Sequence, residues 1–431
     1  MIPSRSCGSV VDVGVDVQTL LRLDADLKDF VDGVFGSLRR KGWQERCFCY
    51  LTGLMLDGRR KSVQPMAQRL DEPNDQSLNH FVTNTPWDWE PVRRQLARRM
   101  QQVIDPSAWV FDDTGFVKDG RASPCVARQY TGTAGKITNC QVATTLHLAT
   151  DSASCPVNWR LFMPESWDPA SGKASADVAA RRAAAAIPAE EHHRPKWQLA
   201  LECVDQALSW GLPAPAVAVA DAGYGDAAEF RHGLTARDIP YTVQISSVLT
   251  VLPATATRTT PHYPGLGRPP KPRYETPAQS VKDHIMAIGP RRAARITWRT
   301  GSKQRHGQPQ PMTSRFVFCR VRQADAGTRS IHKDQDLPEC WLIAEWPTGK
   351  PEPTRYWLST LPKNTKKTAL VRACKQRWRV EHDYRELKTG LGLDHYEGRK
   401  WAGWHHHVTL VAAAHGFLTW HRQHPKATVP E

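Results

Sequence analysis

Two aspartate-containing segments have the composition expected of a site that holds cations. FDDTGF (111–116) places acids at the end of an apolar run, and VADAGYGD (219–226) does so again before a glycine-containing turn. Successive residues of a strand face opposite sides, so only one of Asp112 and Asp113 can join a given site. Carboxylates that converge in space can bind a pair of magnesium ions, which stabilise the attacking and leaving oxygens of an in-line phosphoryl transfer.

A third acid lies in RWRVEHDYRELK, residues 377–388. Successive helical residues are about 100° apart, so Arg377, Glu381, Tyr384 and Lys388 share one charged helix face. A solvated helix with one Arg and Glu pair would also explain this face, at a few tenths of a kcal/mol. In combination with the two aspartate segments, the face instead indicates a metal ligand beside cations that contact phosphate.

The elements that would position these acids follow from hydrophobic periodicity. Short apolar runs bounded by turn residues predict strands, and apolar residues at helical spacing predict helices. The order of three strands, helix, strand, helix, strand is that of a ribonuclease-H-like fold. The predicted strands are 108–115, 138–150, 158–165, 214–221 and 241–247, and the helices are 196–211 and 227–238.

The sequence divides into four parts by the type of secondary structure that each predicts. Residues 1–105 predict a helical domain, and residues 106–247 the first part of an α/β core. The helical domain is a candidate for DNA binding because of its basic runs 39–41, 59–61 and 98–99, which could equally be solvated faces. Residues 248–362 predict a β-rich insertion, with strands at 294–300, 314–322, 340–346 and 354–362. Residues 363–431 predict the C-terminal helices of the core: one from Asn364 or Thr365 to Gly390, and one over 405–423.

The insertion also carries a loop rich in proline and glycine, residues 258–277. Its cations Arg268, Lys271 and Arg273 are candidate phosphate contacts. The strand tryptophans of the insertion are candidates for stacking on a base, although packing within the sheet is the commoner role of such residues. These tryptophans are Trp298, Trp341, Trp346 and Trp357.

Composition favours a polyanionic partner. The chain has 431 residues, of which 40% are hydrophobic, and 58 Lys and Arg against 43 Asp and Glu give a formal charge of +15. No stretch of apolar residues is long enough to span a membrane, and the N-terminus lacks the pattern of a secretion signal. The ten cysteines form no CxxC pair, which favours reduced thiols in the cytoplasm. Consecutive helical residues such as His405, His406 and His407 point in different directions and do not easily share one zinc ion.

Several motifs together resemble one known family. DDTGFVKDG, VARQYTGTAGKITNCQVA, RLFMPESW, DAGYG, YWLSTLP and GLGLDHYEGRKWAGWHHH occur in this order along most of the chain. The sequence is similar to the DDE transposases of bacterial insertion sequences, specifically the insertion-sequence 701 group related to the insertion-sequence 4 superfamily. The resemblance implies a ribonuclease-H-like core interrupted by a β-rich insertion between the second Asp and the Glu.

The resemblance also implies the site. The family signature of Tyr, Arg, Glu and Lys maps onto Cys374, Arg377, Glu381 and Lys388, so Cys374 replaces the tyrosine, and the phosphate contact of that tyrosine is either lost or passes to Tyr384 or Tyr396. In that signature the Asp before Thr is catalytic, which favours Asp113 over Asp112. The implied catalytic and metal-binding residues are Asp113, Asp221 and Glu381, with Mg²⁺ as cofactor and Mn²⁺ as its substitute.

The implied activity is DNA transposition: metal-dependent cleavage of transposon ends and strand transfer into target DNA. The implied partners are double-stranded inverted-repeat ends and target DNA, bound by a homodimer at the bacterial nucleoid, with no membrane partner. Two alternatives are a catalytically silent DNA-binding regulator and a ribonuclease-H-like nuclease that cuts by DNA structure without joining strands.

Overall fold

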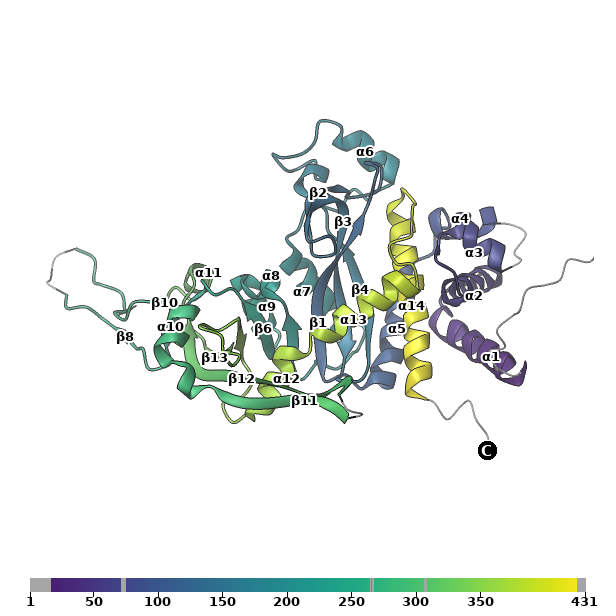
Figure 1. Cartoon of the computed structure of the whole chain (residues 1–431). Coiled ribbons are helices and arrows are strands. Elements are labelled where there is room, and N and C mark those ends of the chain that lie inside the picture. Colours follow the sequence, from purple (N-terminus) through teal and green to yellow (C-terminus); the bar gives the residue numbers. More distant parts are fainter. Residues whose placement is uncertain (1–16, 71–74, 264, 266, 306–307, 425–431) are drawn as a thin grey trace, which may run out of the picture.

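The computed structural model describes residues 17–70, 75–263, 265, 267–305 and 308–424. Figure 1 shows an elongated mixed α/β molecule in which a central sheet lies between the N-terminal helices and a projecting β-rich part. Within the described residues no helix is both long and apolar enough to cross a bilayer. Residues 1–16, where we looked for a secretion signal, lie outside the described part.

The N-terminal part is helical, as the sequence predicts. Its helices pack on the last helix of the chain, α14 (Trp401–Gln423): the rings of Phe30 and Phe417 meet edge to face with centroids 5.6 Å apart. One hydrophobic core continues from these helices through α14 into the sheet, so the helical part is not a separately packed unit. The helices are α1 (Val17–Val34), α2 (Lys41–Met55), α3 (Val63–Arg69), α4 (Asp75–Thr83) and α5 (Trp89–Ile104).

A twelve-stranded sheet in the described residues forms the centre of the molecule. Its first strand is antiparallel to β3 and parallel to β5, which is itself parallel to β6. The predicted strands are therefore confirmed, including the buried parallel one, while the edge strand β2 was not predicted. The strands are β1 (Ala108–Val117), β2 (Ala127–Thr131), β3 (Lys136–Ala149), β4 (Ser154–Leu161), β5 (Ala218–Ala220) and β6 (Tyr241–Ile245).

Helices cover both faces of these strands. One face of β1 packs against the helices between β4 and β6, where Phe111 meets Phe230 edge to face at 5.8 Å. The opposite face is crossed by the helices that follow the insertion (Figure 1). The helices that pack on the first of these faces are α7 (Lys196–Ser209), α8 (Ala222–Gly225) and α9 (Ala228–Thr235). Helix α6 (Val178–Ala185) instead packs on a 3₁₀ turn at Glu165–Trp167, beyond the ends of β2 and β3 (Figure 1).

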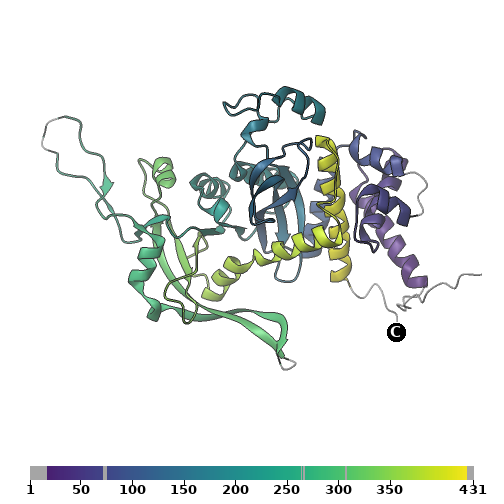
Figure 2. The ribbon, with the colours of Figure 1, turned by 45° about the horizontal axis from the view of Figure 1, so that its top comes forward.

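The part between residues 248 and 362 extends the same sheet, because β14 pairs antiparallel with β6. The four predicted strands are present, and two short helices that the sequence did not predict lie among them. A long β11–β12 ribbon is visible in Figure 2. The elements are β7 (Thr250–Pro253), β8 (Arg258–Thr259), β9 (Arg273–Tyr274), β10 (Gln279–Ser280), α10 (Val281–Ile288), a 3₁₀ turn (Pro290–Arg292), β11 (Ala294–Arg305), β12 (Gln308–Gln323), α11 (Ala326–Ile331), β13 (Glu339–Glu345) and β14 (Arg355–Ser359).

The single helix expected up to Gly390 is instead segmented, and that expectation is wrong. It consists of α12 (Lys367–Lys375), α13 (Trp378–Arg385) and a π-helical turn (Glu386–Gly390). Near the break, backbone N–H groups of Gln376 and Arg379 bond carbonyls three residues back instead of four, which tightens the chain.

The start of α12 also differs from expectation. Its N-cap is Lys366, which makes no side-chain cap, and neither Asn364 nor Thr365 caps the helix. The last helix starts at Trp401, four residues earlier than expected.

The three consecutive histidines of α14 are buried and have separate partners. His407 Nδ1 lies 3.0 Å from the Tyr50 hydroxyl, and His406 lies 2.8 Å from the carbonyl oxygens of Val82 and Trp87. His405 lies 3.2 Å from the guanidinium of Arg93. Burial lowers the pKa of His406 to about 4, so these rings act as neutral packing and hydrogen-bonding groups between α14 and the N-terminal helices.

A glycine fixes how closely α8 approaches the sheet. A Cβ on Gly225 would lie 1.9 Å from the carbonyl oxygen of Gln244 on β6, and a backbone atom cannot move aside cheaply. We expect Gly225→Ala to lower the free energy of unfolding by about 1–3 kcal/mol or more, measured by urea denaturation. Gly120→Ala is the control, since nothing lies within 4 Å of its added Cβ. Equal stability of the two variants would contradict this packing.

Candidate active site

The three acidic segments meet at one open cleft of about 750 Å³. Strand β1 contributes its two aspartates, the turn after β5 contributes Asp221, and α13 contributes Glu381. The fold therefore brings together the acidic segments singled out from the sequence. The cleft is lined by Asp112, Asp113, Thr114, Tyr130, Thr131, Gly132, Thr133, Val142, Asp221, Arg377, Glu381, Tyr384, Arg385, Lys388 and Thr389.

The two adjacent aspartates of β1 point to opposite faces of the sheet. Asp112 is opposite Thr145 in the antiparallel pair, and the Thr145 hydroxyl lies 2.5 Å from that of Tyr384 on α13. Asp112 therefore faces the helix that carries Glu381, because cross-strand partners share a face.

Asp113 has different neighbours. The hydroxyl of Tyr224 on α8 donates a 2.6 Å hydrogen bond to its Oδ1, and Lys196 at the start of α7 forms an ion pair with its Oδ2. Both partners belong to the helices on the face away from α13. Asp113 is thus the better neutralised of the two aspartates.

Asp221 follows β5 on the same side as Asp112. Phe111 and Ala220 are partners in the parallel β1–β5 pair, so the next residue of each strand lies on the other face, towards α13. Asp221 also caps α8, since its Oδ1 accepts a 2.9 Å hydrogen bond from the backbone N–H of Gly223. Burial and the carboxylate of Asp113 raise the pKa of Asp221.

Arg377 lies between the acids as their counter-charge. Its Nη1 is 3.0 Å from Glu381 Oε1 and 3.6 Å from Asp112 Oδ2. Burial alone would lower the pKa of Arg377, but the carboxylates of Asp112, Asp221 and Glu381 raise it. The charge of Arg377 does not fully compensate Asp112. Burial, with the nearby Asp221 and Asp113, still raises the pKa of Asp112 to about 8.

Two other residues of the charged helix face are engaged with the protein. Lys388 Nζ donates to the carbonyl oxygen of Gly115 at 2.7 Å and to the Thr133 hydroxyl at 2.8 Å, and burial lowers its pKa to about 8. Burial raises the pKa of Tyr384 well above its usual value. Tyr384 therefore remains a neutral hydrogen-bonding group beside the cleft.

A buried group on α13, which sequence reasoning missed, anchors this helix. Asp383 Oδ2 lies 2.9 Å from His147 Nδ1 on β3, and its Oδ1 accepts a 2.6 Å hydrogen bond from the Ser154 hydroxyl on β4. Burial would raise the pKa of Asp383, but the bond with His147 and the nearby His415 lower it. Its position two residues after Glu381, on the other side of the helix, was the available sequence signal.

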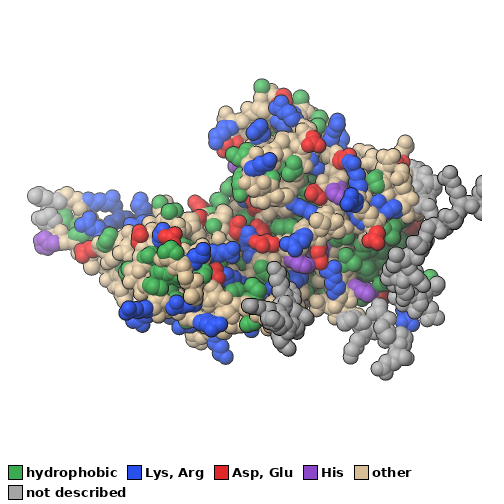
Figure 3. Space-filling model, in the orientation of Figure 1, with side chains coloured by type: hydrophobic (Ala, Val, Ile, Leu, Met, Phe, Trp, Pro, Cys, Tyr) green, Lys and Arg blue, Asp and Glu red, His purple; other side chains and the backbone are tan. Residues whose placement is uncertain are grey.

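The other predicted phosphate contacts do not line the cleft. Arg268 and Lys271 belong to the loop between β8 and β9, which projects from the far end of the molecule (Figure 1), and Arg273 is the first residue of β9. Lys271 Nζ pairs with Asp334 at 2.5 Å. Figure 3 shows Lys and Arg side chains along this projecting loop.

The insertion tryptophans are at least partly buried in the β-rich part. Trp298, Trp346 and Trp357 are buried, and Trp341 is partly buried. The ammonium of Lys375 lies 5.1 Å from the ring centroid of Trp298. This arrangement agrees with the commoner packing role.

The acids of the cleft suit a divalent cation by charge and by donor chemistry. Asp112 and Asp221 offer hard oxygen ligands on one face. Burial, together with neighbouring carboxylates, raises the pKa of both groups, and a bound cation would offset this cost of ionisation. In the described part of the chain, however, no three His, Cys, Asp or Glu side chains are close enough together to hold one ion. Glu381 is the acid with freedom to approach, since its side chain is 65% exposed.

A mixed α/β sheet with carboxylates from two parallel strands and a helix at one cleft is the arrangement of a metal-dependent nuclease. The chain belongs to the DDE superfamily endonucleases, whose family model matches residues 33–305. This match confirms the family that the sequence motifs indicated. It includes Asp112, Asp113 and Asp221 and ends before Glu381.

One curated relative carries a more specific name. A probable transposase for insertion sequence element IS701 from Microchaete diplosiphon is 33% identical over 120 residues. The aligned stretch covers 27% of this chain and 32% of the relative, so it spans about a third of the relative's length.

The raised pKa of Asp112 predicts how pH affects stability. The pKa of this carboxyl rises from about 4 in the unfolded chain to about 8 in the folded protein. Below pH 4 the carboxyl is protonated in both states and does not affect stability. Between pH 4 and pH 8 the free energy of unfolding falls as pH rises, because the unfolded chain ionises more readily. We expect Asp112→Asn to raise the melting temperature by a few degrees at pH 8–9 and to have less effect near pH 4, measured by calorimetry.

Added Mg²⁺ supplies a second test of the same site. It should stabilise the wild-type protein at pH 8 more than the Asp112→Asn protein, because only the former gains a counter-ion for this carboxylate. If the melting temperatures of the wild-type and Asp112→Asn proteins changed with pH in the same way, ionisation of Asp112 would not oppose folding.

Proposed function

We propose that this protein is a DDE transposase, which cleaves the ends of a mobile DNA element and joins them to target DNA. The observation that carries the proposal is the convergence of Asp112, Asp221 and Glu381 on one open cleft in a chain of the DDE superfamily endonucleases. The name of the relative from Microchaete diplosiphon and the net positive charge support the same activity.

We propose a ribonuclease-H-like core for this enzyme. The antiparallel run β1, β3, β4 followed by β5 and β6 parallel to β1 supports it, with helices on both faces. On this interpretation the segment from β7 to β14 is an insertion between the second Asp and the Glu, which lengthens the sheet beyond β6. The two aspartates then lie where the parallel pairing of β1 with β5 ends, next to the cleft.

We assign the first carboxylate to Asp112 in place of Asp113, which the family signature favoured. Asp112 faces α13 and lacks a full complement of counter-charge, whereas Asp113 is already paired with Lys196 and Tyr224 on the other face. The catalytic acids are then Asp112, Asp221 and Glu381. They would hold Mg²⁺, or Mn²⁺ in its place, which supplies Lewis-acid stabilisation of the oxygens at the reacting phosphate.

The side chains around the acids bind and orient the DNA. Arg377 and Lys388 place positive charge at the cleft for backbone phosphates, and Tyr384 offers a neutral hydroxyl. The projecting loop with Arg268, Lys271 and Arg273 provides a second, distant DNA contact. Because two ends must be cut together, we propose that a homodimer assembles on the two inverted repeats and the target.

The chemistry proceeds in two displacements at phosphorus. Water first attacks a phosphodiester at the transposon end and breaks the bond to the 3′ oxygen, which leaves a free 3′-OH and a 5′-phosphate as the two ends of the cut strand. That 3′-OH then attacks a target phosphodiester, forms a new P–O bond and displaces a target 3′-OH. No covalent bond to the protein is needed.

Substitution of the carboxylates tests the assignment. We expect Asp112→Asn, Asp221→Asn and Glu381→Gln each to lower Mg²⁺-dependent nicking of supercoiled plasmid by roughly a thousandfold or more, because each removes a metal ligand worth several kcal/mol to the transition state. Binding to DNA, measured by gel shift, should persist. Asp113→Asn is the matched control, and it should retain nicking. Full activity of Asp112→Asn with loss in Asp113→Asn would reverse the assignment.

Strand transfer separates a transposase from a nuclease or a silent regulator. Linear DNA with the element's ends, incubated with plasmid and Mg²⁺, should yield covalently joined products that run as new bands on agarose and are absent with Glu381→Gln. Nicking without joined products would favour a structure-specific nuclease. Binding without nicking would favour a regulator.

A further inference from the structure

A polar groove lies beside the candidate active site, between the N-terminal helices and the segment 392–400 that precedes α14. It consists of two adjoining hollows of about 710 and 590 Å³, which have Arg60, His395, Glu397 and Arg399 in common. None of the residues that line it belongs to the carboxylate cleft.

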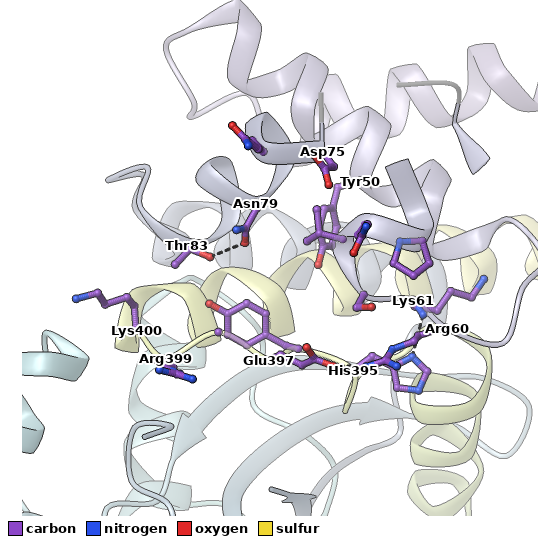
Figure 4. Close-up of a pocket in the computed structure, with 17 residues that line it drawn as sticks. Tyr50, Arg60, Lys61, Asp75, Asn79, Thr83, His395, Glu397, Arg399 and Lys400 are labelled. Atoms are coloured by element: carbon purple, nitrogen blue, oxygen red, sulfur yellow. Dashed lines mark hydrogen bonds and ion pairs between the residues drawn. The ribbon is translucent and has the colours of Figure 1, made fainter. Parts of the chain in front are cut away.

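The groove has two facing walls of polar side chains. In Figure 4, Asp75, Asn79 and Thr83 of the N-terminal helices face the segment that carries Glu397 and Arg399, across an open space. Such hydroxyl and amide groups, together with cations, are the side chains that contact the sugar-phosphate backbone of DNA.

Cations outnumber acids along the groove. Arg59 and Arg399 are exposed, and neither forms a hydrogen bond or ion pair with any other described residue. Arg60 pairs with Glu397 at 2.5 Å, but both side chains are largely exposed. The cations are Arg59, Arg60, Lys61, Lys118, Arg399 and Lys400, and the acids are Asp75, Asp119, Asp394 and Glu397.

Strand β1 and the residue after it link the active cleft to the groove. Lys388 at the cleft bonds the carbonyl of Gly115, and three residues further along Lys118 Nζ donates to the carbonyl of Tyr396 at 2.5 Å in the groove wall. From Asp112 to Lys118 a strand advances about 20 Å. At 3.4 Å per base pair this is about six base pairs of B-form DNA.

We propose that this groove binds the backbone phosphates of the DNA that continues from the scissile bond, about six base pairs away. The inference rests on the proposed function, since it takes the cleft to hold DNA. Arg59 and Arg399, as free guanidiniums on opposite sides of the groove, make the main phosphate contacts. The N-terminal helices thereby act in DNA binding together with the segment 392–400, and not as an independent module.

The test compares two double variants with the same change in charge. Arg59→Ala with Arg399→Ala removes the groove cations, and Arg291→Ala with Arg292→Ala removes two exposed cations of the β-rich part. Binding to a random-sequence duplex of about 30 base pairs is measured by fluorescence anisotropy over a range of salt concentrations, because phosphate contacts set the salt slope. Circular dichroism melting checks that both variants remain folded.

We expect the groove variant to bind at least about tenfold more weakly and to lose about one unit of salt slope per phosphate contact, with little change in the control. A photo-crosslinking amino acid in place of Arg399 should then mark DNA about six base pairs from the cut. Equal affinity and slope in the two variants, or cross-links only at the cut, would overturn the groove assignment while nicking by the wild-type protein remained. Absence of both binding and nicking in the wild-type protein would instead overturn the proposed function.

Discussion

The parallel pairing of β1 with β5 is the constraint on which the site depends. Partners in adjacent parallel strands share a face and lie about 5 Å apart, so the register Phe111–Ala220 forces Asp112 and Asp221 into proximity on the face of α13. Two carboxylates this close, in a partly buried setting, repel each other. Three features of the local structure lessen this repulsion: Arg377 is a counter-charge, the backbone N–H of Gly223 donates to Asp221, and the open cleft gives a cation access to both acids.

The helix that carries the third acid is held from its other side. Asp383, buried against His147 and Ser154, anchors α13 to β3 and β4, and the tightened turn before α13 sets the direction in which Arg377 and Glu381 project. The two sides of α13 thus have different tasks. The buried one fixes the helix to the sheet, and the exposed one leaves Glu381 free to move towards the aspartates.

The N-terminal helices are built into the same core as the sheet, mainly through α14. His405, His406 and His407 join α14 to α2, α4 and α5 by separate contacts, and they do so as neutral groups because burial opposes their protonation. Their rigid attachment places a polar, cation-rich groove next to the end of β1. DNA recognition and chemistry would then occur at two neighbouring sites, and the length of a single strand, β1, sets the distance between them.

The sequence by itself determined the helical N-terminus, the order of strands and helices, the three acidic segments and the family. These features depend on local periodicity and on short motifs, which are properties of neighbouring residues. Tertiary structure alone decided which of the two adjacent aspartates faces α13, because that depends on the register of β1 against β3 and β5. It also decided the breaks around α13, the burial of Asp383 with His147 and the formation of the groove. Each of these arises where segments distant in the sequence pack together, and no local pattern contains that information.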